Sequence, residues 1–339
     1  MHSSSLRRSV VLRRRPHGEP SPDDFAVVED AIPSPGAGEV LTRTIFLSID
    51  PYMRGRLSER ASYAAPVQIG EVMTGETVGE VIESNDPAWA PGDVISGARG
   101  WQSHTVSAGK TLMKLPRDGA PLSTYLGVLG MPGTTAYSGM TDIGQPRAGE
   151  TVVISAASGA VGSVAGQLAK RAGARVIGIA GGPDKCFFAQ ETLGFDNCID
   201  HRALDLHNEL ARVCPNGIDV YFENVGGAVQ MAVFEQLNPF ARVVMCGMVS
   251  QYNATEMPPG PNLGFVIGKR VRIQGLIVSD KPERFAEWRS LASPWVRDGS
   301  LKYREDIVDG LENAPEALTR ILGGQNFGKL LVRVGPDPI

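Results

Sequence analysis

Hydrophobic positions follow two different patterns along the chain. Up to about residue 125, short β-like runs such as EVLTRTIFLSID (39–50) and GETVGEVIES (75–84) are separated by proline and glycine. Strands at this close spacing predict a compact, partly barrel-like β domain. From Tyr125 to about Arg297, β-rich segments alternate with helical ones, which predicts parallel βαβ units built around one sheet.

The C-terminal run NFGKLLVRV (326–334) returns to a β pattern, so we expect it to rejoin the first domain. The predicted fold class is α/β, with a Rossmann-type, doubly wound parallel sheet plus an N-terminal β domain that the C-terminal tail completes. The predicted domains are residues 1–125, residues 126–300, and a return segment at 301–339. A chain of 339 residues is also too long for one ordinary core.

The first residues, MHSSSLRRSVVLRRRP (1–16), are basic and contain serine, so a transit peptide is one interpretation of them. The other is an ordinary first strand, because Val10, Val11 and Leu12 are followed by a basic cluster and Pro16. We favour the strand, and with it a cytoplasmic location.

Composition narrows the class of protein. The chain is 42% hydrophobic and 21% charged, as in soluble globular proteins, and its net charge of −4 argues against nucleic acid as the main partner. No apolar run approaches the roughly 20 residues that span a bilayer, so no membrane is expected among its partners.

The cysteines and histidines show no metal-binding spacing. The four cysteines lie in the second half of the chain without a C-x-x-C pair, and the five histidines include neither H-E-x-x-H nor a close pair. This pattern predicts buried thiols in a reducing compartment, no disulfide framework and no metal. The cysteines are Cys186, Cys198, Cys214 and Cys246.

The stretch VVISAASGAVGSVAGQLAKRAGARVIGIAGG (152–182) reads as strand, tight glycine turn, helix and strand. In its A-x-G-x-x-G motif, Gly159 lets the backbone approach a pyrophosphate and Gly162 lets the helix pack closely on the strand. The alternative, a turn without a ligand, is disfavoured by the strand and helix on either side. The predicted cofactor residues of the turn are Ala157, Ser158, Gly159, Ala160, Val161 and Gly162.

An NAD site usually has a carboxylate at the end of its second strand, but here IGIAGGPDKC (177–186) has Gly181 there and Lys185 shortly after. If strand three lies beside strand two, His201 and Arg202 come to the same edge. Three cationic residues around one ribose predict a pocket for a 2′-phosphate, and hence NADP(H). The alternative is a solvated basic rim.

Two further strand ends carry polar groups, in YFENVGG (221–227) and MCGMVSQYN (245–253). Asn224 has both a donor and acceptors for a ribose or carboxamide. Tyr252 has a phenol that can donate to an oxygen that gains charge, unless it is an ordinary surface tyrosine. Gly247 and Ser250 lie at the same strand end and are also predicted to contact the cofactor.

Four motifs together resemble the zinc-independent branch of the medium-chain dehydrogenases and reductases: DPYMRGR, AASGAVGSVAGQLAK, YFENVGG and YNATEMPPGP. Within it, the chain is most similar to prostaglandin reductases (leukotriene hydroxydehydrogenases) and bacterial curcumin reductases, from about Arg7 to the C-terminus. The resemblance implies a GroES-like domain for substrate and catalysis, an NADP-binding Rossmann domain, NADPH in the cleft between them, and commonly a homodimer. It also implies reduction of the carbon–carbon double bond of small hydrophobic enones and enals.

The resemblance implies roles for individual residues as well. It places the glycine turn at the pyrophosphate, Lys185 at the 2′-phosphate, and Tyr252 near the substrate carbonyl and the ribose hydroxyls. Near the nicotinamide end it places Asn224, Asn326, Thr135 and, toward the substrate, Met131. Tyr52, Arg54 and Tyr63 would line the cleft from the first domain.

This chain departs from its relatives at two places. Near the phosphate, prostaglandin reductases have a serine where Gly182 stands and a tyrosine where His201 stands, and a histidine would strengthen phosphate binding at lower pH. Zinc-dependent relatives have G-H-E where this chain has Thr74, Gly75 and Glu76, which agrees with a metal-free site.

Without a metal to polarise a carbonyl, an enone is an easier target than a ketone. Hydride would pass to the β-carbon, and the Tyr252 hydroxyl with a ribose hydroxyl would stabilise the enolate oxygen. Water, Tyr52 or Tyr63 would protonate the α-carbon. Quinone reduction remains a rival, as does NADPH binding without catalysis, which would need none of the three tyrosines. The missing zinc ligands disfavour alcohol oxidation.

Overall fold

The computed structural model describes residues 6–60, 62–117, 119–203 and 205–338. The first described element is strand β1 (Leu6–Leu12), in which Val10 and Leu12 are fully buried. The predicted first strand is therefore confirmed. It pairs antiparallel with β2 (Phe25–Ala31) over its full length. The first five residues of the basic N-terminal segment lie outside the described residues.

The chain folds into two compact units. The first runs to Leu126 and is continued by Glu305–Asn326 and by the segment from Leu330 on. The second comprises Gly127–Arg304 together with Phe327–Lys329. The chain thus leaves the first unit and later returns to it. The assignment of substrate and catalysis to one unit, and of NADP to the other, stays a prediction.

A seven-stranded sheet forms the centre of the first unit. Its order is β14-β15-β3-β4-β5-β7, with β6 paired to β3. Strand β15, from the predicted tail, runs antiparallel to β3, so the tail completes the N-terminal β domain as predicted. Among the described residues of this unit, the α-helices are α1 (Met53–Arg56) and α9 (Ala314–Leu322). The strands are β3 (Glu39–Ser48), β4 (Glu76–Ser84), β5 (Val94–Ala98), β6 (His104–Ala108), β7 (Met113–Lys114), β14 (Glu305–Asp309) and β15 (Lys329–Arg333).

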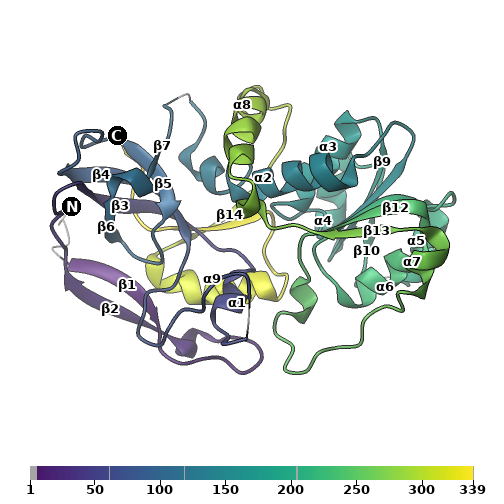
Figure 1. Ribbon diagram of the computed structural model, residues 1–339, viewed down its shortest axis with the longest axis horizontal. Coiled ribbons are helices and arrows are strands. Elements are labelled where there is room, and N and C mark those ends of the chain that lie inside the picture. Colours follow the sequence, from purple (N-terminus) through teal and green to yellow (C-terminus); the bar gives the residue numbers. More distant parts are fainter. Residues whose placement is uncertain (1–5, 61, 118, 204, 339) are drawn as a thin grey trace. The chain divides into compact units, whose positions relative to one another are not determined.

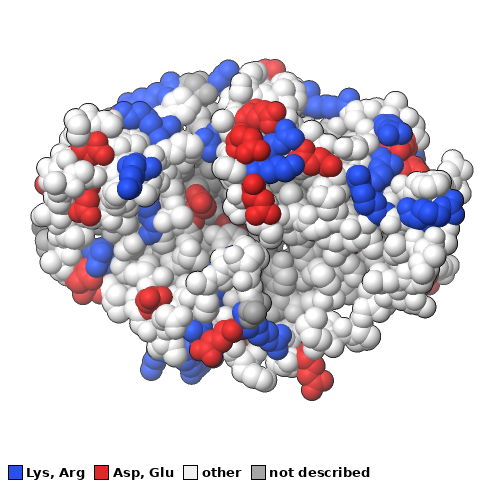
Figure 2. Space-filling view, in the orientation of Figure 1, with Lys and Arg blue, Asp and Glu red and all other residues white. Residues whose placement is uncertain are grey.

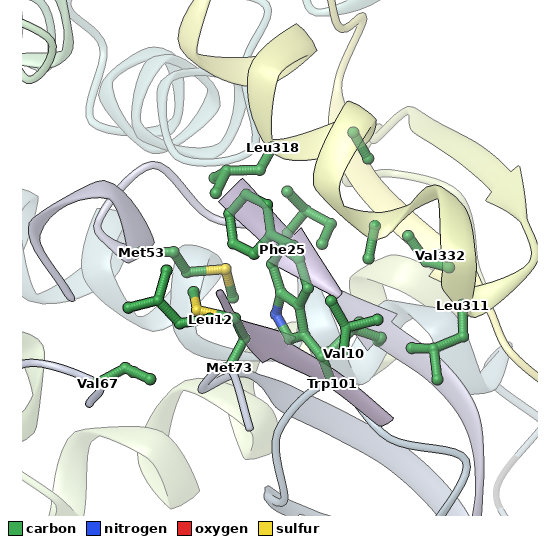
Figure 3. Close-up of a cluster of buried hydrophobic side chains, with 14 of the residues drawn as sticks. Val10, Leu12, Phe25, Met53, Val67, Met73, Trp101, Leu311, Leu318 and Val332 are labelled. Atoms are coloured by element: carbon green, nitrogen blue, oxygen red, sulfur yellow. The ribbon is translucent and has the colours of Figure 1, made fainter. Parts of the chain in front are cut away.

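The core of the first unit joins side chains from both ends of the chain (Figure 3). Trp101 is fully buried and stacks on Phe25, with the ring centroids 5.7 Å apart. Leu318 of α9 and Val332 of β15 belong to the same cluster as Val10. Burying these large apolar side chains together explains why the C-terminal segment folds with the N-terminal one.

The second unit contains a six-stranded parallel sheet in the order β10-β9-β8-β11-β12-β13 (Figure 1). Counted along the chain this is 3-2-1-4-5-6, so the predicted doubly wound order is confirmed. All five residues of TVVIS in β8 are buried, as a central parallel strand requires. The strands are β8 (Thr151–Ser155), β9 (Arg175–Ala180), β10 (Asn197–Asp200), β11 (Ile218–Glu223), β12 (Leu237–Met245) and β13 (Arg272–Gly275).

Helices connect these strands, and α3 packs on the sheet through glycine. A Cβ at Gly166 would lie 1.9 Å from the Phe195 ring, and one at Gly178 would lie 2.8 Å from the Ala157 Cβ. Only glycine therefore allows this approach. The helices are α2 (Met131–Ser138), α3 (Gly162–Arg171), α4 (Pro183–Phe187), α5 (Leu206–Val213), α6 (Gly227–Glu235), α7 (Gly264–Lys269) and α8 (Glu283–Arg297).

Acidic and basic side chains are interspersed in small groups on the face that Figure 2 shows. No described helix is both long and apolar enough to cross a membrane. All four cysteines are free, and three of them are buried. Cys246 departs from the prediction of buried thiols because it is only partly buried. It follows β12 (Leu237–Met245) directly, at the carboxyl edge of the sheet.

Candidate functional site

The glycine turn between β8 and α3 is tight. Ala156 opens it with a φ of 50°, a left-handed conformation that costs a non-glycine residue about 1 kcal/mol or more. A Cβ at Gly162 would lie 2.3 Å from the Ala156 carbonyl oxygen, so no other residue fits there. Gly159 donates its N–H to the same carbonyl at 2.9 Å.

This turn presents backbone donors at the start of α3. No described residue accepts a hydrogen bond from the N–H groups of Ala160 and Val161. Ala157 and Ser158 are buried within the turn. The helix dipole adds partial positive charge at the same point. Backbone donors without a partner among the described residues, together with that charge, fit a pyrophosphate.

The ends of β9 and β10 bring the predicted phosphate-binding residues together. A Cβ at Gly181 would lie 2.7 Å from Arg202 Nε and 3.1 Å from His201 Nε2, so both side chains lie against that glycine. Burial lowers the pKa of His201, and the charges of Arg202 and, more weakly, Lys185 lower it further. Lys185 therefore lies near the same edge. That these residues bind a phosphate stays a prediction.

Asp200 organises this edge, although the sequence analysis did not select it. Its Oδ1 accepts hydrogen bonds from the N–H groups of Gly182, at 2.8 Å, and Arg202, at 3.0 Å. The bond from Gly182 is the main cause that lowers the pKa of this carboxyl group. Gly182 has a φ of 103°, which would strain a residue with a side chain. The only signal for Asp200 in the sequence was its place as the last residue of a predicted strand.

Ser155, at the end of β8, holds Asn224 just after β11 through two hydrogen bonds. The Ser155 hydroxyl accepts from the Asn224 N–H, and the Ser155 carbonyl accepts from Asn224 Nδ2, each at 2.8 Å. No described residue donates to the Asn224 Oδ1. The side-chain amide is thus oriented by one of its donors, while its oxygen can accept from a ligand.

Gly247, Ser250 and Tyr252 lie in one turn after β12. The Tyr252 hydroxyl accepts from the Met248 N–H at 3.4 Å, and a Cβ at Gly247 would lie 3.1 Å from that hydroxyl. The Ser250 hydroxyl donates to the Val225 carbonyl at 2.6 Å. This bond ties the turn to the loop after β11, so these three predicted residues lie beside the Asn224 segment.

Helix α2 carries Met131 and Thr135 one turn apart. The Thr135 hydroxyl donates to the Met131 carbonyl at 2.8 Å, and α2 packs against α3. Asn326 belongs to the first unit, in the segment before β15. Its approach to the nicotinamide stays a prediction.

The first unit holds a second group of predicted residues around α1. Arg54 is buried, and its Nε and Nη2 donate to the Gly18 carbonyl at 3.2 and 2.7 Å. The sequence analysis did not select Arg56. Its guanidinium carbon lies 5.6 Å from the Tyr52 ring centroid and 4.6 Å from that of Tyr63, so one cation joins the two tyrosines.

These two tyrosines differ in environment. Tyr63 exposes 61% of its surface. Burial, followed by the charges of Asp50 and Glu76, raises the pKa of Tyr52 well above its usual value. The Tyr52 phenol therefore stays protonated and is better suited to donate a hydrogen bond than to transfer a proton.

Among the described residues, no group of three or more His, Cys, Asp and Glu side chains is arranged to hold a metal ion. A Cβ at Gly75 would lie 2.8 Å from a Leu47 methyl carbon and 3.0 Å from the Trp101 ring. A histidine therefore has no room at Gly75, the position at which zinc-dependent relatives have one.

Comparison with known proteins agrees with this geometry. Residues 8–115 match the family described as the N-terminal domain of oxidoreductase, and residues 160–295 match the family described as zinc-binding dehydrogenase. The chain is 51% identical to the NADPH-dependent curcumin reductase of Escherichia coli (strain K12) over 336 residues, or 97% of each protein. It is 39% identical to prostaglandin reductase 1 of Oryctolagus cuniculus over 338 residues, which cover 95% of this chain and 92% of the relative.

A solved structure extends this likeness to three dimensions. The crystal structure of CurA in complex with NADPH from Vibrio vulnificus matches with a TM-score of 0.93 at 48% identity, covering 97% of this chain and 100% of that one. The likeness thus spans both units, and the predicted resemblance is confirmed. The chain belongs to the medium-chain dehydrogenase/reductase family, in the branch that includes the curcumin and prostaglandin reductases.

Proposed function

We propose that this protein is an NADPH-dependent reductase of the carbon–carbon double bond of α,β-unsaturated ketones and aldehydes. The relative at 51% identity is named an NADPH-dependent curcumin reductase, and the structural neighbour at a TM-score of 0.93 is a complex with NADPH. The observation that carries the proposal is a row of groups along one edge of the parallel sheet. In the order of the strands, the basic residues after β10 and β9 come first, followed by the glycine turn after β8, Asn224 after β11 and Tyr252 after β12. A dinucleotide that lies across the carboxyl ends of the strands requires this order of groups.

NADPH fits this edge group by group. The N–H groups at the start of α3 would bind the pyrophosphate. Lys185, His201 and Arg202 would bind the 2′-phosphate, with Gly181 allowing close approach. The Asn224 amide would bind the nicotinamide half, together with Gly247, Ser250 and Thr135.

Bound NADPH supplies the hydride that the β-carbon of the substrate receives. Negative charge then collects on the carbonyl oxygen of the substrate. We assign to the Tyr252 hydroxyl the hydrogen bond that stabilises this charge. Because the hydroxyl oxygen accepts from the Met248 N–H, its own proton can be directed to the substrate oxygen.

The remaining contacts to the substrate would come from Tyr52, Arg54 and Tyr63 of the first unit. Met131 of the second unit would add a further contact. The raised pKa of Tyr52 opposes loss of its proton. Water or Tyr63 is therefore the better source of the proton that the α-carbon receives, with Tyr52 as a hydrogen-bond donor.

A cofactor-oxidation assay on the purified protein tests this proposal. NADPH or NADH would be combined with an aryl enone, a 2-alkenal, curcumin and a quinone, and the products identified by mass spectrometry and NMR. Rapid loss of NADPH with a saturated ketone as product supports double-bond reduction. Turnover of the quinone alone would show quinone reduction instead, and NADPH binding without any turnover would show a non-catalytic binding protein.

We also propose a cytoplasmic homodimer. Strand β13 lies at the edge of the parallel sheet and all four of its residues are exposed. Leu263 and Ile267, in the α7 segment that precedes it, are 57% and 82% exposed. A second copy could cover this apolar surface by pairing edge to edge. The free cysteines support a reducing compartment.

A further inference from the structure

A buried carboxylate lies under the loop that follows β11. Glu223 ends that strand and has no exposed surface. Its Oε1 accepts three hydrogen bonds: from the Ser155 hydroxyl at 3.0 Å, the Val225 N–H at 2.7 Å and the Gly226 N–H at 3.0 Å. Three donors therefore converge on this one oxygen.

These bonds hold the segment that presents Asn224. The Ser155 hydroxyl that donates to Glu223 also accepts from the Asn224 N–H, so Glu223 and Asn224 are linked through one serine. The Glu223 carbonyl accepts from the N–H groups of Cys246 and Gly247, at 2.9 and 3.1 Å. Glu223 thus connects the end of β8, the loop after β11 and the start of the Tyr252 turn.

The loop also has a conformation that needs an internal acceptor. Gly226 and Gly227 have φ values of 77° and 59°, and the left-handed turn directs the N–H groups of Val225 and Gly226 inward. Without the Glu223 carboxylate these buried donors would have no partner in the arrangement seen, and the loop would have to rearrange.

We propose that Glu223 is a positioning residue for the nicotinamide half of NADPH, acting through Ser155 and the Val225–Gly226 turn to hold the Asn224 amide in place. The inference rests on the proposed function, because it concerns how that cofactor is bound. Glu223 itself does not touch the ligand in this account. Its removal should weaken contacts to the nicotinamide half and leave the adenosine half unaffected.

The two halves of the cofactor can be probed separately. 2′,5′-ADP carries the adenosine and the 2′-phosphate and reaches only the β9–β10 edge and the turn. For Glu223→Ala, we expect the Kd for NADPH to rise about tenfold or more while the Kd for 2′,5′-ADP stays within about twofold, both measured by calorimetry. A general loss of structure would weaken both ligands together.

Two further variants separate hydrogen bonding from charge and from folding. Glu223→Gln keeps an oxygen that can accept from Ser155 and the two N–H groups, so it should bind NADPH within about threefold of the wild type. Ser155→Ala keeps Glu223 but breaks its link to Asn224, and it should reproduce the NADPH defect in part. If Glu223→Ala does not fold, the Kd values of Ser155→Ala for NADPH and 2′,5′-ADP test the proposal instead.

Asp219 offers a matched control on the same strand. Its carboxylate accepts from the Thr151 N–H and from Asn238 Nδ2, each at 2.8 Å, at the opposite end of the sheet. Asp219→Asn should lower stability without changing either Kd.

The inference is overturned if Glu223→Ala and Ser155→Ala bind NADPH as the wild type does, or weaken both ligands by the same factor. Glutamine as damaging as alanine would also overturn it, because the charge rather than the hydrogen bonds would then matter. Failure of the wild type to bind NADPH at all would instead remove the proposed function, and the role of Glu223 with it.

Discussion

Tyr252 is the residue on which the proposed chemistry depends most directly. For Tyr252→Phe, turnover of an enone should fall roughly a hundredfold or more, because one donor to the developing oxyanion is lost, while the NADPH Kd changes little. Steady-state kinetics with calorimetry measure both. Tyr137→Phe is the matched control, since the Tyr137 ring stacks on Trp288 of α8 and has no role in the proposed mechanism. Wild-type turnover by the Tyr252 variant would remove Tyr252 from the mechanism.

Lys185 should determine the choice between the two nicotinamide cofactors. Lys185→Ala removes a charge predicted to face the 2′-phosphate, so NADPH should bind about tenfold more weakly and NADH should change little. Lys281→Ala, which breaks a surface ion pair with Asp142, should change neither. Equal weakening of both cofactors by the Lys185 variant would show that Lys185 does not bind the phosphate.

His201 should make NADPH binding depend on pH. Burial, then Arg202 and Lys185, lower its pKa below the usual 6.5, so the free protein holds a neutral ring at pH 7. A bound phosphate favours the protonated ring. NADPH affinity should therefore rise as the pH falls from 6.5 through the lowered pKa, whereas NADH affinity should not.

Titration calorimetry across this pH range measures the effect. In His201→Gln, NADPH affinity should no longer rise as the pH falls. It should only decrease, because the phosphate itself becomes protonated, with a second pKa of about 6. If the wild type and this variant show the same pH profile, His201 does not contact the phosphate.

At the scale of elements, helix α3 requires glycine where it crosses the Phe195 ring. Gly166→Ala would place a Cβ 1.9 Å from that ring, so it should destabilise the protein by about 1–3 kcal/mol even though alanine is the better helix former. Gly268→Ala, in α7, is the control, because nothing lies within 4 Å of its Cβ position. It should be neutral or stabilising by up to about 1 kcal/mol. Denaturant unfolding compares the two, and equal stabilities would contradict this packing.

At the scale of the whole molecule, the exposed edge strand predicts association. The wild type should have the mass of a dimer in light scattering. Ile273→Lys, in β13, should shift it toward the monomer by placing a charge at the edge. Ile69→Lys, at a residue of the first unit that is 62% exposed, should leave the mass unchanged. A monomeric wild type would remove the homodimer from the proposal.

The architecture of this protein could be predicted from its hydrophobic pattern and its motifs. Alternating β and helical segments predicted the parallel sheet, and the glycine turn predicted the doubly wound strand order that the structure has. The strand order in turn predicted which strand ends share an edge. For that reason His201 and Arg202 were expected at the same edge as Lys185, and the structure has both side chains against Gly181 at that edge. Their contact with a phosphate stays a prediction.

The polar side chains that hold the carboxyl edge of this sheet together could be identified only in the folded protein. Asp200 and Glu223 share with many other residues the only signal that the sequence offers, a place at the end of a predicted strand. Glu223 and Ser155 are 68 residues apart, and the carboxylate finds its donors only when two strand ends and a glycine turn have come together. Periodicity reports which face of an element is buried. The partner of each buried polar atom depends on loop conformations that distant residues impose.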